Sequence, residues 1–288
     1  MKYRFLAFPG GKQKAVTFSY DDGVCQDKRL AEIFCKYGVK GTFNVNSGLF
    51  GAEGANGGRL SAEEIKKYII DKGHEIATHG AFHIASGCAS PTLCLKDAFE
   101  CRSSLEETFD MIIRGMAYAD SGIRVLTNGN DYATIKNILT YSGIAYSRSL
   151  AGDNSKFELP TDFHAWVPTA HHDNPDLLLW IDAFNSIEYS TVRAKLNAPK
   201  IMYIWGHSYE FDQKNNWDRI ETICEKLSGR DDTWYATNIE IYDYVKAYQS
   251  LIFSANETKV HNPTATEIWL TYDFKTVKIL PKQTLKLD

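Results

Sequence analysis

Short apolar, β-branched runs alternate with stretches of helical period along most of the 288-residue chain. The runs predict strands at the following residues: 14–20, 40–46, 74–79, 111–118, 144–147, 200–205 and 233–236. The stretches between them predict helices at the following residues: 27–37, 61–73, 93–109, 131–141, 175–186, 216–227 and 239–251. This alternation predicts an α/β fold whose parallel strands are joined by crossover helices. Periodicity leaves open whether the sheet closes into a barrel.

The last part of the chain breaks this rhythm, because short strand-like runs follow one another there without helices between them. These runs lie at the following residues: 260, 267–272, 277–280 and 284–287. We therefore expect residues 1–251 to form the main domain and residues 252–288 a small β-rich extension packed on it. A sugar-binding appendage and an oligomer contact are alternative roles for this extension.

Polar residues with metal-binding or acid–base chemistry follow three of the predicted strands. Asp21 and Asp22 end the first strand, His79 and His83 follow the third, and His207 follows the strand at 200–205. Parallel strands end on one face of the sheet, where active sites of such folds gather. Each feature alone fits a structural role, such as an Asp-Gly turn or a hydrogen-bonded histidine.

Together, however, these residues form a hydrolytic set. Two imidazoles and one carboxylate can hold a divalent metal and leave positions open for water and substrate. We expect zinc, although cobalt, nickel, iron and manganese also suit these ligands. The second carboxylate supplies a base, and the distant histidine supplies an acid. His74 and Glu75 before His79 do not form the zinc-protease motif, because the two histidines are not spaced to share a helix face.

The motifs resemble those of the polysaccharide deacetylases, the NodB-homology group of carbohydrate esterases. The segment 19–23 (SYDDG) is similar to their Thr/Ser-Phe-Asp-Asp-Gly motif, and 79–83 (HGAFH) is similar to their His-Ser/Thr-x-x-His motif. The segment 204–207 (IWGH) is similar to their strand that ends in Leu-His, with glycine before the histidine. The resemblance covers residues 14–251.

The resemblance implies a distorted (β/α)7-type barrel and a metal-dependent deacetylase. It assigns Asp21 as the general base and His207 as the general acid, and it places the metal on Asp22, His79 and His83. Further residues that would bind or orient the substrate are Arg114, Tyr118, Trp166 and His172.

Those further positions depart from the family pattern. Arg114 would orient Asp21, but the Arg-Pro-Pro-Tyr-Gly motif is not present around it, and a surface role is the alternative. Trp166 would form the wall of an acetyl pocket, although no acid precedes it directly. His172, in the run 169–173 (TAHHD), would reach sugar hydroxyls or a second metal, or lie in a surface loop.

Charge and composition argue against nucleic acid and membrane as partners. The net charge of −4 is spread along the chain, and no basic stripe indicates nucleic acid binding. No apolar run is long enough for a membrane helix. The first nine residues have a basic start, but their apolar stretch is too short for a signal peptide. We therefore expect a cytoplasmic protein or a secreted one whose leader has been removed. The six cysteines show no C-x-x-C pair, and we expect free thiols.

The expected substrate is therefore a carbohydrate, either an N-acetylglucosamine oligomer or polymer or an acetylated xylan. The alternatives are a family member that binds carbohydrate without turnover and a metal-dependent hydrolase of amides outside sugars. The sequence does not indicate an oligomeric state.

Overall fold

The computed structural model describes residues 3–54, 56–150, 154–189 and 199–287. Its strands are β1 (Arg4–Ala7), β2 (Lys14–Asp21), β3 (Gly41–Val45), β4 (Glu75–Thr78), β5 (Gly115–Ala117), β6 (Tyr146–Arg148), β7 (Ala170–His171), β8 (Lys200–Gly206), β9 (Thr233–Tyr235), β10 (Ile252–Phe253), β11 (Lys259–His261), β12 (Ile268–Tyr272), β13 (Lys275–Ile279) and β14 (Thr284–Lys286). Its helices are α1 (Asp27–Tyr37), α2 (Ala62–Tyr68), α3 (Pro91–Phe109), α4 (Tyr132–Tyr141), α5 (Leu177–Asn185), α7 (Tyr209–Gln213), α8 (Trp217–Leu227) and α9 (Asn238–Gln249).

The central sheet is parallel and has β2 in its middle. The strand order is β6-β5-β4-β3-β2-β8-β7, and β9 also pairs with β2. On one side β2 pairs with β8 from Lys14 to Tyr20. On its other side the first part of β2 pairs with β9 and the last part with β3. Every residue of β2 is buried, as expected for a parallel strand in the middle of a sheet.

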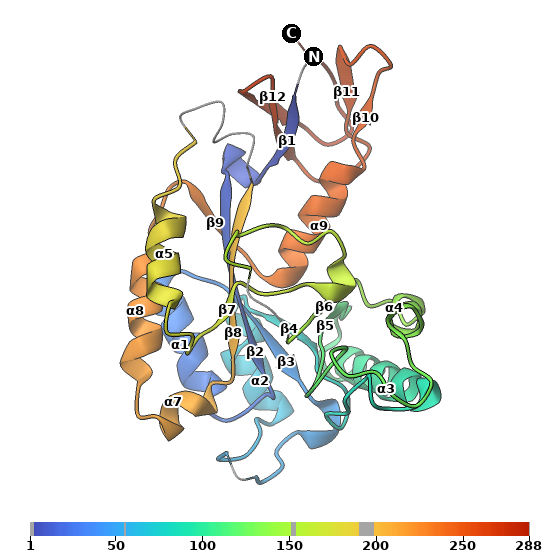
Figure 1. The fold of residues 1–288 in the computed structure, drawn as a ribbon, viewed down its shortest axis with the longest axis vertical. Coiled ribbons are helices and arrows are strands. Elements are labelled where there is room, and N and C mark those ends of the chain that lie inside the picture. The colour runs from blue at the N-terminus through green and yellow to red at the C-terminus, as the bar shows by residue number, and fades with distance from the viewer. Residues whose placement is uncertain (1–2, 55, 151–153, 190–198, 288) are drawn as a thin grey trace.

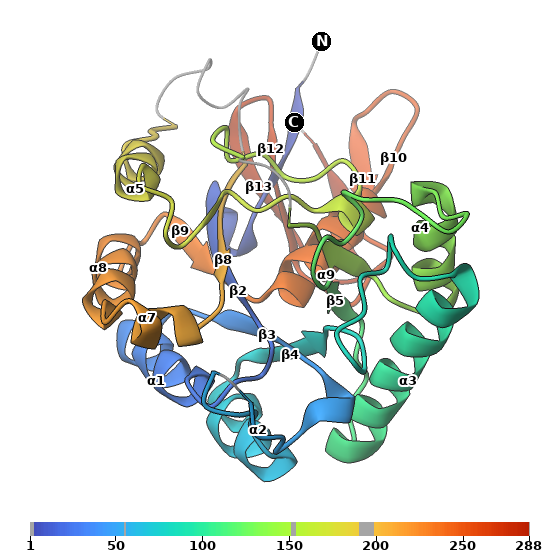
Figure 2. The same ribbon diagram turned by 60° about the horizontal axis from the view of Figure 1, so that its bottom comes forward.

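The sheet curls into the predicted distorted barrel. The stretch that begins at Trp166 forms a parallel bridge with Arg148 at the end of β6, and a few residues later β7 pairs with β8. This stretch therefore links the two ends of the curled sheet. Figure 2 shows the helices around the sheet, with α8, α1, α2, α3 and α4 following one another along its outside. The predicted fold class is confirmed.

Local sequence explains why the helices begin and end where they do. Ser61 caps α2 by accepting from the backbone N–H of Glu64, and the Glu64 side chain accepts from the N–H of Ser61 in return. Helix α1 ends at Gly38, whose φ of 65° is easily reached only by glycine. The glycine at 41 lets β3 approach α1 closely, since a Cβ there would lie 2.7 Å from the Phe34 ring.

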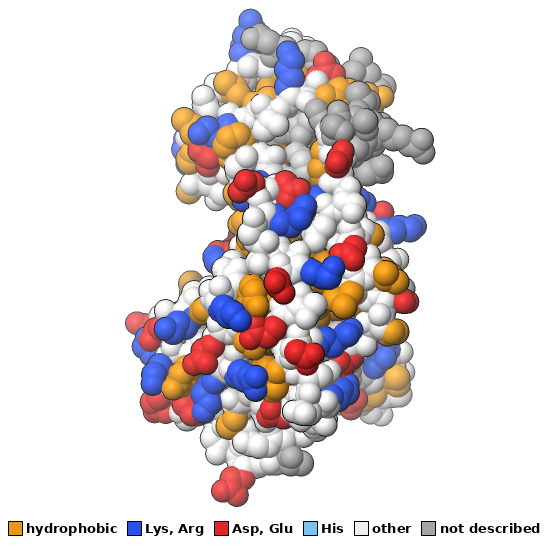
Figure 3. All heavy atoms as spheres, turned by 90° about the vertical axis from the view of Figure 1, so that its left-hand side faces the viewer, with side chains coloured by type: hydrophobic (Ala, Val, Ile, Leu, Met, Phe, Trp, Pro, Cys, Tyr) orange, Lys and Arg blue, Asp and Glu red, His pale blue; other side chains and the backbone are white. Residues whose placement is uncertain are grey.

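The C-terminal strands form two small antiparallel sheets above the barrel in Figure 1, with the orders β1-β12-β13 and β10-β11-β14. Val260, Leu270 and Ile279 form part of a separate apolar cluster between them. The hydroxyl of Tyr244 in α9 connects this part to the barrel, because it donates to the carbonyl of Ala7 and accepts from the N–H of Trp269. In Figure 3 the molecule narrows between these two parts.

Strands β7 and β10 and helix α7 were not predicted, and two further differences concern β5 and β1. The expected strand at 111–118 is reduced to β5, Gly115–Ala117, and residue 112 is 75% exposed. Strand β1 was not expected, and it pairs with β12, so the N-terminus belongs to the same small sheet as the tail. The division of the chain at residue 251 stays a prediction. None of the helices in the described residues is both long and apolar enough to cross a bilayer.

Candidate active site

The two aspartates at the end of β2 lie at the carboxyl end of the sheet, and the backbone turns between them and α1. Asp21 is the last residue of β2, opposite Asn44 of β3. Asp22 has a φ of 86°, and His83 has a φ of 59°. Residues other than glycine rarely adopt this left-handed conformation, and such strain gathers at functional sites. Two of the three expected metal ligands therefore show strained backbone.

The structure brings these three ligands together. Asp22 Oδ1 lies 3.7 Å from His79 Nε2 and 3.4 Å from His83 Nε2. The three ligand atoms lie within 4.8 Å of one another, and the two imidazole rings meet edge to face. Donor atoms this close to one another can share one cation at ordinary ligand distances.

The surroundings of these atoms also fit a metal. His79 Nδ1 lies 2.9 Å from the carbonyl oxygen of Ala117 at the end of β5, to which it donates, so the lone pair is left on Nε2. Burial lowers the pKa of His79, which favours the neutral ring that a metal requires. Asp22 Oδ1 is buried and has no hydrogen-bond partner among the described residues, while Arg59 lies 3.4 Å away. The residues present therefore fit the expected divalent ion.

Asp21 is fully buried and held by two partners. Its Oδ2 forms an ion pair with Nη2 of the fully buried Arg148, which ends β6. Its Oδ1 accepts from Asn44 Nδ2 at 2.9 Å. Burial raises the pKa of Asp21, but the charges of Arg148, His79 and His207 outweigh this and leave the pKa below its ordinary value. The carboxylate is therefore ionised, as a general base must be.

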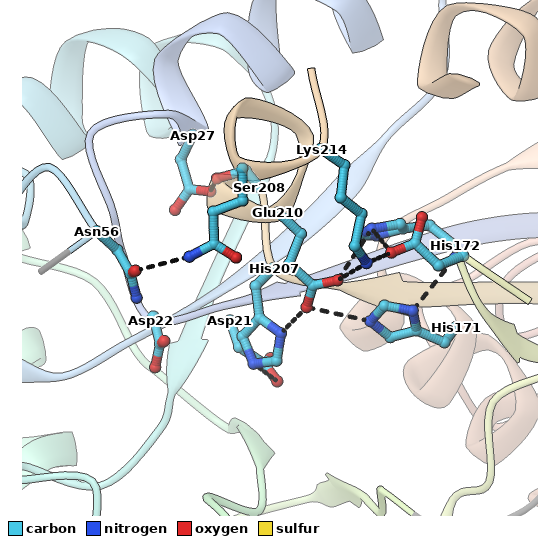
Figure 4. Close-up of polar contacts among 12 residues, drawn as sticks. Asp21, Asp22, Asp27, Asn56, His171, His172, His207, Ser208, Glu210 and Lys214 are labelled. Carbon is cyan, nitrogen blue, oxygen red and sulfur yellow. Dashed lines mark hydrogen bonds and ion pairs between the residues drawn. The ribbon is translucent and has the colours of Figure 1, made fainter. Parts of the chain in front are cut away.

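His207 faces Asp21 from the other side. Its Nε2 lies 4.0 Å from Asp21 Oδ2, and its Nδ1 lies 2.7 Å from Glu210 Oε1 in the first turn of α7. Figure 4 shows the ring between these two carboxylates. Burial lowers the pKa of His207, but Glu210 and Asp21 outweigh it and raise the pKa above its ordinary value. The protonated form that a general acid needs is favoured.

Arg114 does not orient Asp21. Its guanidinium forms a bidentate ion pair with the exposed Asp243 of α9. The expected strand at 111–118 begins only at Gly115, so Arg114 precedes β5 and lies at the opposite end of that strand from the site. Arg148, at the carboxyl end of the next strand, takes the expected place.

Tyr118 and Trp166 belong to the core in this structure. The hydroxyl of Tyr118 donates to the carbonyl oxygen of His164 at 2.9 Å. Trp166 is 0% exposed and packs edge to face on Tyr146 and Tyr203, so no open face is left for an acetyl group. These contacts place both side chains in packing roles.

His172 lies close to His207 but is completely buried. Its ring stacks between Tyr20 and Phe211, with ring centres 5.7 and 4.3 Å away. It therefore does not reach a sugar from this position. Its Nε2 instead lies 3.4 Å from Glu210 Oε2.

Sequence reasoning missed Arg148 and Glu210. Arg148 directly follows the strand predicted at 144–147, so the strand-end criterion that found Asp21 also points to it. Glu210 follows His207 by one turn of a helix, and that spacing is the signal that places the two side chains on one side.

Known proteins show the same fold. Residues 9–128 match the family model described as polysaccharide deacetylase. A Mycobacterium smegmatis protein assigned to the polysaccharide deacetylases superposes with a TM-score of 0.58 at 16% identity, over 85% of this chain and 94% of that one. A family 4 acetyl xylan esterase from Clostridium thermocellum, solved with a cobalt ion, has a TM-score of 0.48 at 17% identity over 80% and 90% of the two chains.

The deacetylase PplD from Streptococcus pyogenes, solved with acetate, has a TM-score of 0.41 at 20% identity. That match covers 47% of this chain and 55% of PplD, so the chain spans about half of its length. No curated protein matches the sequence significantly. The chain is therefore similar to the polysaccharide deacetylases, in sequence over residues 9–128 and in its barrel fold.

Proposed function

We propose that this chain is a metal-dependent carbohydrate deacetylase that hydrolyses acetyl groups from N-acetylglucosamine-containing saccharides or from acetylated xylan. The observation that supports this most is the convergence of Asp22, His79 and His83 beside the base–acid pair Asp21 and His207. One divalent ion, for which zinc is the first choice, would bind to the three ligands and would acidify a water molecule and polarise the acetyl carbonyl.

The chain's own residues carry the proton transfers. Asp21, ionised and fixed by Arg148 and Asn44, accepts a proton from the attacking water. His207, protonated and held by Glu210, donates a proton to the departing amine or alkoxide. His207 Nε2 lies 4.0 Å from Asp21 Oδ2, so both groups can reach one reacting centre.

N-acetylglucosamine saccharides and acetylated xylan differ in the leaving group, which is an amine in the first and an alkoxide in the second. The three metal ligands do not distinguish between these two substrates. A test is acetate release from chitin oligomers and from acetylated xylan by the zinc-reconstituted protein. We expect turnover of one class, and a loss of roughly 10²–10⁴-fold in kcat/KM for Asp21→Asn, the usual contribution of one acid–base group.

A surface variant, Asp243→Asn, is the matched control, because Asp243 is an exposed aspartate far from the ligands. Unchanged acetate release by Asp21→Asn would exclude Asp21 as the base. If the wild type binds either saccharide but releases no acetate, the protein is instead a carbohydrate-binding member of the family.

A further inference from the structure

A second group of polar residues lies directly behind His207 and converges on one carboxylate. Glu210 Oε1 lies 2.7 Å from His207 Nδ1 and 3.4 Å from His171 Nε2. Its Oε2 lies 3.4 Å from His172 Nε2 and 3.4 Å from Lys214 Nζ. Figure 4 shows Glu210 at the centre of this arrangement, with three imidazoles around it. The side chain is 14% exposed.

The elements that carry these residues explain how the arrangement forms. Helix α7 begins at Tyr209, two residues after His207, so Glu210 lies in its first turn and close to the end of β8. His171 ends β7, which pairs with β8, and His172 follows it. The Asp173 N–H donates to His171 Nδ1 at 3.2 Å, which leaves Nε2 of that ring as the donor toward Glu210. The histidine pair therefore holds Glu210 from the neighbouring strand.

His171, His172, Asp173 and Glu210 also have donor atoms close enough for a cation. Lys214, however, already pairs with both carboxylates, and Arg219 lies 3.7 Å from Asp173. Lys214 and Arg219 thus supply the positive charge that the neighbouring carboxylates of Asp173 and Glu210 require. This favours a cluster of paired charges that supports Glu210 over a second metal site.

We propose, on the basis of the function proposed above, that Glu210 is a positioning residue that holds His207 toward Asp21 in its protonated form, and that His171 and His172 fix Glu210. Glu210 reaches His207 from α7, the helix that follows it. Gly206 makes room for the buried His172, because His172 Nδ1 would lie 1.9 Å from a Cβ at that position.

The charge of Glu210 gives this pairing a chemical consequence. The charge of Asp22 acts on His207. The groups in contact with His207 are Glu210, Asp21, His171, Trp205 and Tyr209. Two of them are carboxylates, and Glu210 is the nearer. An ionised partner at hydrogen-bond distance favours the charged imidazolium over the neutral ring. Without Glu210, the protonated ring would be less populated, and it could rotate away from Asp21.

The test is Glu210→Gln in the full chain, which keeps the shape and an accepting oxygen but removes the charge. Histidine ring NMR titrations, with His207 assigned through His207→Asn, measure the protonation of this ring with and without added zinc. We expect the His207 titration to move to lower pH in the variant. In acetate release, kcat/KM at high pH should fall by roughly tenfold more than at low pH, while KM stays nearly constant.

Glu221→Gln is the control, because Glu221 pairs with Lys36 on the exposed face of α8 and should change neither readout. Glu210→Asp should restore part of the titration shift if the charge is what matters. An unchanged His207 titration in correctly folded Glu210→Gln overturns the proposal, as does a uniform loss of activity at all pH values. If no substrate is turned over, the proposed function fails, while the titration still decides the pairing. A second bound zinc that Glu210→Gln loses would show a metal site here and would also overturn it.

Discussion

The imidazole of His172 occupies the space that any side chain at residue 206 would need. A Cβ built on Gly206 would lie 1.9 Å from His172 Nδ1 and 2.4 Å from its Cε1. His172 is fully buried between Tyr20 and Phe211, so it cannot move aside without disturbing the core. The glycine before His207, which departs from the family pattern, is therefore the partner of this buried histidine.

Gly206→Ala should destabilise the protein by about 1–3 kcal/mol, the usual cost of overpacking a core, and should also reduce acetate release by displacing His172 and Glu210. Denaturant unfolding measures the first effect. Gly54→Ala is the control, because a Cβ at Gly54 would meet no atom within 4 Å. In Gly206→Ala/His172→Ala the two costs should be clearly less than additive. Full additivity would show that the two residues do not compete for this space.

Two arginine–aspartate pairs distinguish the observed site from the expected one. Arg148 and Asp21 are both buried, whereas the side chains of Arg114 and Asp243 are 35% and 49% exposed. Arg148→Met should cost about 3–5 kcal/mol, because it leaves a buried carboxylate without its counter-charge. Arg114→Met should cost about 0–1 kcal/mol. We also expect a loss of roughly 10²-fold in kcat/KM for Arg148→Met alone. If Arg114→Met instead lost more stability and activity than Arg148→Met, Arg114 would be the residue that orients Asp21.

Asp27 gives a prediction for pH. It is fully buried at the start of α1, and its Oδ1 accepts from the hydroxyl of Ser208 at 2.6 Å. Burial raises the pKa of Asp27 to about 8. Because the folded-state pKa lies above that of the unfolded chain, the protonated group contributes stability that is complete below pH of about 4 and is lost as pH rises toward about 8.

Asp27→Asn remains neutral throughout this range. The stability of the wild type relative to this variant should therefore fall between pH 4 and pH 8, with a slope of up to about 1.4 kcal/mol per pH unit. Denaturant unfolding of both metal-free proteins across this range measures it. A difference that does not change with pH would show that Asp27 ionises normally in the folded state.

Much of the site could be predicted because it depends on local order along the chain. Asp21, Asp22, His79 and His207 each follow a strand whose apolar pattern is clear, and strands that run in parallel end on one face. The alternation of strands and helices also predicts the parallel sheet, whereas the closure into a barrel was implied by the family resemblance. His83 is close enough in sequence to His79 for one turn to return it to the same place.

The partners of these residues were harder to predict, because they depend on where short strands begin and how distant elements pack. Arg114 falls inside the strand predicted at 111–118, but β5 starts after it, so its side chain lies at the opposite end of β5 from the site. Three strands lie between β6, which carries Arg148, and β2, which carries Asp21. The two side chains meet only because the sheet is curled. The burial of Trp166 and His172 likewise depends on contacts with strands far away in the sequence.

The most direct test of the proposed centre is a zinc titration by calorimetry of the metal-free wild type, Asp22→Ala and His171→Ala. The wild type should bind one zinc ion, and His171→Ala should bind it equally well. Removal of a hydrogen-bond partner of a metal ligand usually costs roughly 10–100-fold in metal affinity. Asp22→Ala should lose more affinity than this, because it removes a ligand itself. Zinc binding that survives in Asp22→Ala, or that is lost in His171→Ala, would contradict the assignment of the metal to Asp22, His79 and His83.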